Sequence, residues 1–207
     1  MKLYMFPAPN PLRVSMFLAE KGIDIPTEPV ALLDGASRKP EFLKINSLGE
    51  VPVLELDDGT HICESVAICR YLETLHPEPS LFGRDDREQA HIEMWNRRLE
   101  RHLMDVIGGV GLHTFEFFKD KIEQIPAFAD SQRRLMAKKW AWFDQEMSDG
   151  RKFVAGDRIS VADLTGAAAL KIQEYAQEAI PPGLTHASAW AARIEARPGW
   201  PKPAEAA

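Results

Sequence analysis

The amino-acid sequence predicts an α/β domain followed by an all-α domain. A strand, a helix and a second strand follow one another within residues 2–31, and a β-hairpin occupies residues 51–63. Beyond a connector rich in proline and charge at residues 76–86, the apolar residues recur only at helical spacing. We therefore expect domain boundaries of 1–77 and 86–207.

The strand–helix–strand unit comes first. Residues 2–6 and 27–31 are short apolar strands, and the helix between them ends at Gly22. Asn10 followed by Pro11 predicts the start of this helix, with the amide as N-cap and proline at the first helical position. The crossover is expected to be right-handed and the two strands parallel.

The hairpin offers a backbone edge to a ligand. Residues 51–56 form its first strand, 57–59 its turn and 60–63 its returning strand. Pro52 stands at the head of the first strand, where a residue without an N–H is tolerated and a cis bond is accessible. A cis bond would turn the backbone of Val51 outward, and an extended, peptide-like ligand could then pair with its N–H and C=O.

The helix after the hairpin predicts a binding site for an amino-acid head group. Glu64 and Ser65 precede the helical pattern of residues 66–75, which makes Ser65 an N-cap candidate. The free N–H groups and the positive dipole end beside Ser65 can bind a carboxylate, and Glu64 can accept a protonated amine. We therefore expect a ligand with an amino-acid head and a peptide middle.

The second part of the chain is predicted to be helical throughout. Ser160 and Asp163 form a capping box before one of its helices, in which the serine caps the helix and the acid reaches back. The aromatic segment 113–118 either packs in the core, which we favour, or lines a cleft. The helices are expected at residues 87–110 (one helix or two in sequence), 130–147, 164–176 and 187–196.

Composition excludes several classes of function. Of the 207 residues, 45% are hydrophobic and 27% charged, as in ordinary globular proteins, and the net charge of −6 argues against a nucleic-acid surface. No apolar run is long enough for a membrane span, and prolines interrupt the N-terminal apolar residues, so we expect a cytoplasmic protein without membrane contact. The cysteines, Cys63 and Cys69, are interpreted as small buried residues, and no cluster of ligands predicts a metal.

At the Val51-Pro52 turn and the Glu64-Ser65 pair, the sequence resembles the cytosolic glutathione transferase family. With the N-terminus and the helical half, the likeness covers nearly the whole chain. It implies a thioredoxin-like N-terminal domain that binds glutathione, a C-terminal helical-bundle domain in which the capping box is buried, a symmetric homodimer and a role in detoxification. The glutathione-binding residues that it implies are Lys39, Val51, Pro52, Glu64 and Ser65.

The first strand-to-helix turn departs from the common pattern of this family, in which a Ser, Cys or Tyr stabilises the glutathione thiolate. The serine position falls on Ala8. The local sequence instead looks like that of bacterial Nu-class-like members, in which an asparagine faces the glutathione sulfur, so Asn10 is the catalytic candidate. The alternative is that Asn10 only caps the helix.

The sequence offers few cations for the glycine carboxylate of glutathione. Arg38 and Lys39 are the nearest cations to the position of the glycine carboxylate, or else they are ordinary loop charges. Glu50 stands where family members often carry Lys, Arg or Gln, and an acid there disfavours a carboxylate.

Two functions follow from the resemblance. In the first, bound glutathione thiolate attacks a small hydrophobic electrophile, a disulfide or a peroxide. The first turn lacks a Cys-x-x-Cys pair, so thiol–disulfide exchange would use the sulfur of glutathione itself. In the second, the chain is a non-catalytic binding or stress protein with a vestigial site, an alternative that Ala8 and Glu50 favour.

Overall fold

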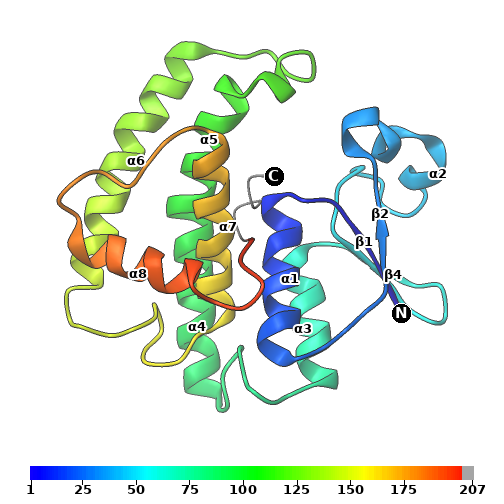
Figure 1. Ribbon diagram of the computed structural model, residues 1–207, viewed down its shortest axis with the longest axis horizontal. Coiled ribbons are helices and arrows are strands. Elements are labelled where there is room, and N and C mark those ends of the chain that lie inside the picture. Colours follow the sequence, from blue (N-terminus) through cyan, green and yellow to red (C-terminus); the bar gives the residue numbers. More distant parts are fainter. Residues whose placement is uncertain (202–207) are drawn as a thin grey trace, which may run out of the picture. The chain divides into compact units, whose positions relative to one another are not determined.

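The structure is a computed structural model that describes residues 1–201 and divides the chain into two compact units (Figure 1). The first unit contains Met1–Ser80 together with residues 197–201, and the second is Leu81–Ala196. The sequence pattern did not indicate that the segment after residue 196 groups with the first unit.

A four-stranded sheet forms the centre of the first unit, with strand order β2-β1-β3-β4. β1 (Lys2–Met5) pairs in parallel with β2 (Thr27–Pro29) and antiparallel with β3 (Val53–Glu55), which pairs antiparallel with β4 (His61–Ile62). The predicted parallel pair and the predicted hairpin are thereby confirmed. The thioredoxin-like arrangement expected of this half is the one observed.

Helices cover both faces of this sheet (Figure 1). α1 (Pro9–Lys21) and α3 (Ser65–Leu75) lie side by side on one face, and the short α2 (Pro40–Leu43) lies on the other. Two 3-10 turns, η1 (Leu32–Asp34) and η2 (Ala36–Arg38), lead from β2 to α2.

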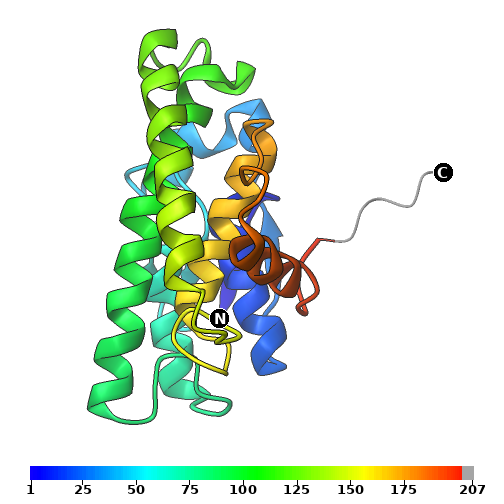
Figure 2. The ribbon, with the colours of Figure 1, turned by 90° about the vertical axis from the view of Figure 1, so that its left-hand side faces the viewer.

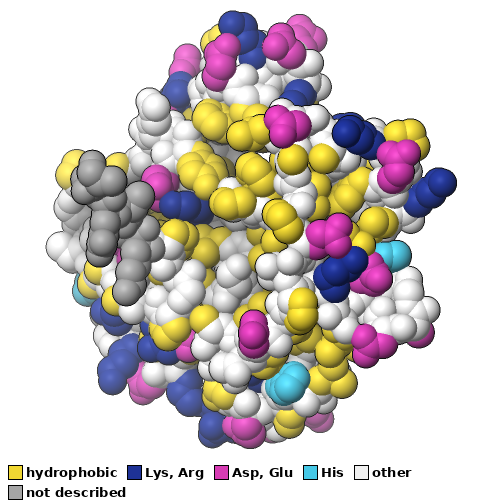
Figure 3. Space-filling model, turned by 45° about the vertical axis from the view of Figure 1, so that its right-hand side comes forward, with side chains coloured by type: hydrophobic (Ala, Val, Ile, Leu, Met, Phe, Trp, Pro, Cys, Tyr) yellow, Lys and Arg dark blue, Asp and Glu magenta, His cyan; other side chains and the backbone are white. Residues whose placement is uncertain are grey.

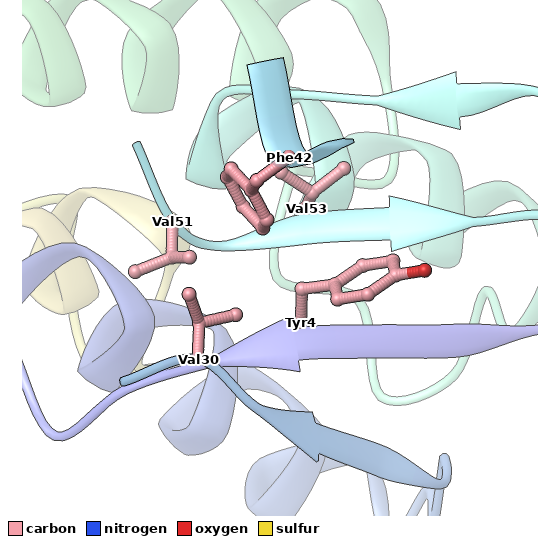
Figure 4. Close-up of a cluster of buried hydrophobic side chains, with 5 residues drawn as sticks. All are labelled: Tyr4, Val30, Phe42, Val51 and Val53. Atoms are coloured by element: carbon pink, nitrogen blue, oxygen red, sulfur yellow. The ribbon is translucent and has the colours of Figure 1, made fainter. Parts of the chain in front are cut away.

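The core beneath α2 fixes the side chain of Val51. Tyr4, Val30, Phe42, Val51 and Val53 form one buried cluster and point toward one another (Figure 4). The rings of Tyr4 and Phe42 meet edge to face, with centroids 5.9 Å apart. Because the side chain of Val51 is anchored here, its main chain is held at the head of β3.

Two predicted helix caps are wrong, that of α1 by two residues and that of α3 by one. α1 begins at Pro9 with Ala8 as N-cap, so Asn10 is the second residue of the helix and makes no cap. Proline is favoured at the first position of a helix, and both Pro9 and Pro11 meet this condition, so the sequence allowed two starting points for α1. Likewise, Glu64 is the N-cap of α3 and Ser65 is its first helical residue.

The second unit is helical, as predicted (Figure 2). The predicted helix 87–110 is two helices joined by one turn of π-helix. The described elements in order are α4 (Asp86–Leu99), the π-helical turn η3 (Glu100–Met104), α5 (Asp105–Thr114), the 3-10 turn η4 (Glu116–Phe118), α6 (Pro126–Glu146), α7 (Val161–Tyr175) and α8 (Thr185–Glu195).

Asp163 organises the centre of this unit. The predicted capping box is present, and the Asp163 carboxylate accepts the Ser160 N–H at 3.0 Å. It also accepts the Val154 N–H and the Trp190 indole N–H, each at 3.0 Å, although the side chain is fully buried. One side chain thus satisfies donors from a loop, a helix start and α8, in agreement with a role in folding.

The aromatic segment differs from the favoured expectation of core packing. Phe115 is 39% exposed, and Phe117 and Phe118 are only half-buried. Their rings contact one another, and Phe115 stacks on Tyr175 with centroids 6.3 Å apart. The cluster therefore lies at the surface of the second unit in this structure.

No helix within residues 1–201 combines the length and the apolar character needed to span a membrane.

Candidate functional site

The N-terminus of α1 presents Asn10 as a hydrogen-bond donor. Pro9 and Pro11 have no N–H, and the Leu12 N–H is bonded to the Ala8 carbonyl at 2.9 Å. Within Pro9–Leu12, therefore, only Asn10 keeps a free main-chain N–H. Its side chain is exposed, so an amide and one backbone donor mark the positive end of this helix.

Asn46 shapes the turn that leads to β3. Its side-chain amide donates to the Glu50 carbonyl at 2.9 Å, and its side-chain oxygen accepts the Leu48 N–H at 3.1 Å. Gly49 is required in this turn, because its φ is +63° and an added Cβ would lie 2.7 Å from the Ser37 carbonyl oxygen.

Val51 leaves this turn with its main chain unpaired. The Val51–Pro52 bond is cis. Among residues 1–201, no backbone hydrogen bond engages the N–H or the C=O of Val51, while its side chain is buried. The backbone edge predicted at this position is therefore open in the structure.

Glu64 and Ser65 form the start of α3 in an unusual backbone conformation. Glu64 has φ 66° and ψ 116°, and its carbonyl accepts the Ile68 N–H at 2.9 Å. Positive φ is uncommon for a residue other than glycine and costs on the order of 1–3 kcal/mol. Such strain is found preferentially at functional sites. The Glu64 side chain is exposed.

Arg13 holds the Ser65 side chain, a contact that sequence reasoning missed. Its guanidinium Nη1 donates to the Ser65 hydroxyl oxygen at 2.5 Å, and both residues are buried. Because the hydroxyl accepts from Arg13, its own proton remains available to donate. An arginine among the apolar residues of α1 was the available signal.

Of the two loop cations, Arg38 contacts the turn before Val51 and Lys39 is exposed. Arg38 donates from Nη1 to the Leu48 carbonyl at 2.9 Å and so braces the turn before Val51. Lys39 is exposed at the N-cap of α2, and Glu50 is also exposed. The structure thus brings Arg38, rather than Lys39, against this turn.

The two cysteines are poor candidates for a nucleophile. Burial raises the pKa of the Cys69 thiol to about 12. Burial, and then the charge of Glu64, raises the pKa of the half-buried Cys63. Both thiols are therefore protonated near neutral pH.

Two further questions about the described residues are whether they form a metal site and whether they form a strongly charged surface. Within residues 1–201, no three His, Cys, Asp or Glu side chains are grouped to bind a metal ion. On the face shown in Figure 3, acidic and basic side chains are interspersed, with hydrophobic side chains between them.

Comparison with known proteins identifies relatives of both units. The family model for the glutathione S-transferase N-terminal domain matches residues 8–75, and that for the glutathione S-transferase C-terminal domain matches residues 111–198. Glutathione S-transferase 2 of Saccharomyces cerevisiae is 36% identical over 203 residues, which are 96% of this chain and 87% of that protein.

Solved structures agree with this result. A glutathione S-transferase domain-containing protein from Marinobacter aquaeolei has a TM-score of 0.90 at 38% identity, covering 97% of this chain and all of its own. Gtt2 from Saccharomyces cerevisiae has a TM-score of 0.88 at 34% identity, covering 96% of this chain and 98% of its own. The predicted fold class is confirmed in both halves.

Proposed function

Because this chain belongs to the glutathione S-transferase family, we propose that its first unit binds glutathione and that the bound thiolate attacks an electrophile, a disulfide or a peroxide. Glutathione is the co-substrate, and the proposal requires no metal. The binding residues in this proposal are Lys39, Val51, Pro52, Glu64 and Ser65, and the catalytic residue is Asn10.

The start of α3 is the observation that carries the proposal. The γ-glutamyl end of glutathione is an amino-acid zwitterion. Its carboxylate would accept from the Ser65 hydroxyl, whose proton is free because Arg13 donates to the oxygen, and from N–H groups of the first helical turn. Its ammonium would pair with the exposed Glu64 carboxylate.

The peptide middle of glutathione would pair with Val51. An extended ligand backbone could add to the open N–H and C=O as another strand adds to a sheet edge. Asn46, Gly49 and Arg38 hold the turn that sets the position of Val51. Lys39 would attract the glycine carboxylate through solvent, a weak contribution at an exposed site.

The thiolate would lie at the N-terminus of α1. Asn10 would supply its side-chain amide and its free N–H, and the helix dipole would favour the anion. With this asparagine-type turn, the chain would resemble the Nu-class-like members of the family. A neutral amide supplies no proton to a leaving group, so we expect reduction of disulfides or peroxides to exceed conjugation of aromatic electrophiles.

We further propose a cytoplasmic homodimer, with residues 1–77 as the glutathione-binding domain and 86–207 as the helical domain. The alternative function is a non-catalytic binding or stress protein. It is favoured by Ala8, which lies at the N-cap of α1 and has no hydroxyl to offer a thiolate, and by the exposed acid Glu50 next to Val51.

Retention on immobilised glutathione, followed by glutathione-dependent reduction of a disulfide and a peroxide, tests the proposal. Retention with turnover is the expected result. Retention without turnover on any electrophile, disulfide or peroxide would favour the non-catalytic alternative, and absence of retention would refute the proposed site.

A further inference from the structure

The second unit contains a cluster of cations around two stacked tryptophans. Trp95 of α4 and Trp142 of α6 lie with ring centroids 6.2 Å apart and planes inclined by 24°. The guanidinium carbons of Arg151 and Arg98 lie 4.7 and 5.1 Å from the centroid of Trp95. Figures 1 and 2 show the loop after α6, which carries Arg151, at the end of this unit where α4 begins.

Three N–H donors of this cluster are buried without an acceptor among the described residues. They are the indole Nε1 of Trp95 and the Nε and Nη2 of Arg151. Trp95 is only 1% exposed. The remaining terminal nitrogen of Arg151, Nη1, donates to Asp149 at 3.1 Å.

The pattern of these donors favours an oxyanion over a water molecule. A buried donor without a partner is destabilising, and native proteins rarely leave several together. Two of the three donors, Nε and Nη2, belong to one guanidinium, so a single acceptor group can engage both. Nε and Nη2 form the side of a guanidinium that binds a carboxylate or phosphate through two parallel bonds.

The neighbouring charges are mainly positive. Lys139 Nζ lies 3.2 Å from Nδ1 of His102, and the His102 ring contacts Trp142. His102 belongs to the π-helical turn η3, and such turns occur frequently at functional sites. The nearby acids are Asp149 and Glu146, which lies 4.0 Å from Arg98. Burial and the charges of Lys139, Arg101 and Arg98 lower the pKa of His102.

We propose that the paired side chains of Trp95 and Arg151 form a binding site for a small oxyanion, a phosphate, sulfate or carboxylate group, in the helical unit. Arg98, whose side chain is 39% exposed, connects the site to solvent. Because the three donor nitrogens are buried, the proposal requires the loop around Arg151 to open before an anion can enter. This site is independent of the glutathione site proposed on the first unit.

Titration calorimetry with the full-length protein tests this site. Sulfate, inorganic phosphate and acetate are titrated separately without glutathione, whose own carboxylates would compete for the site, and a chloride salt keeps the ionic strength constant. A saturable heat with one equivalent of sulfate or phosphate is expected, and acetate reports whether a carboxylate suffices. The absence of saturable binding of all three anions would overturn the proposal.

Matched variants then locate the binding. Arg151→Lys keeps the charge but removes the two-pronged Nε/Nη2 side, and it should weaken binding roughly tenfold or more. Trp95→Phe removes the indole donor but keeps an aromatic ring, and it should weaken binding several-fold. This second variant tests the site even if Arg151→Lys does not fold. Arg134→Gln changes an exposed arginine of α6 and should leave the affinity unchanged. Binding unaltered in both Arg151→Lys and Trp95→Phe would refute the site.

Discussion

Ser65→Ala is the sharpest test of how the head group of glutathione is held. The substitution removes the hydroxyl whose oxygen accepts from Arg13 at 2.5 Å and whose proton would donate to the γ-glutamyl carboxylate. A hydrogen bond to a charged group contributes about 1.5–3 kcal/mol. At about 1.4 kcal/mol per tenfold change, glutathione should bind roughly ten to a hundred times more weakly.

The same substitution should also lower stability. Without the serine oxygen, one N–H of a buried guanidinium loses its acceptor, which costs on the order of 1–3 kcal/mol. Affinity is measured by calorimetry and the free energy of unfolding by urea denaturation, so that the two losses are separated. Thr74→Ala is the matched control, because it removes an exposed hydroxyl of the same helix that donates to the Tyr71 carbonyl.

The control should bind glutathione as the unaltered protein does. An affinity within twofold of the original in a folded Ser65→Ala variant would show that Ser65 does not contact the ligand.

Three further outcomes are expected. Asp163→Ala removes the acceptor of four buried hydrogen bonds and should lower the free energy of unfolding by about 3 kcal/mol or more in urea titrations; a loss below 1 kcal/mol would contradict its central role. The Tyr4 hydroxyl, which donates to Glu55, holds the pKa of that carboxyl below its usual value; the resulting stability is present above the unfolded pKa of about 4 and is lost as the pH falls. In Tyr4→Phe, the free energy of unfolding should therefore fall less steeply as the pH is lowered below about 4. The same steepness in the variant and the unaltered protein would count against this account. Because burial raises the pKa of Cys69 to about 12, a thiol reagent at pH 8 should leave it unmodified in the folded protein, and replacing both cysteines by serine should leave turnover largely intact; loss of turnover would mean that a cysteine performs the chemistry.

The order of elements could be predicted because each has a local signal. Alternating apolar residues around an Asp-Asp-Gly turn are enough to specify the hairpin, although β3 and β4 are shorter than expected. Ser160 and Asp163 specify a helix start at a distance of three residues, and that start is where α7 begins.

The details of the site depend on contacts that local patterns do not contain. The Ser65 hydroxyl was interpreted as a cap because serine favours caps, yet Arg13, 52 residues earlier, engages it and Glu64 occupies the cap. The Asn46 side chain bonds to the main chain of Glu50 and of Leu48, and composition does not reveal these two contacts. The π-helical turn that carries His102 has no sequence signal that we could use.

The pKa of the thiol of bound glutathione, followed by the ultraviolet absorbance of the thiolate, tests the central claim most directly. The Asn10 amide is proposed to stabilise the anion, and each unit of pKa corresponds to about 1.4 kcal/mol of that preference. Asn10→Ala, which keeps the backbone N–H, should raise the pKa and slow disulfide reduction, and Asn10→Asp should raise it further by placing an acid at the helix N-terminus. An identical pKa in the unaltered protein and in Asn10→Ala would contradict the account and leave the thiolate to the helix backbone alone.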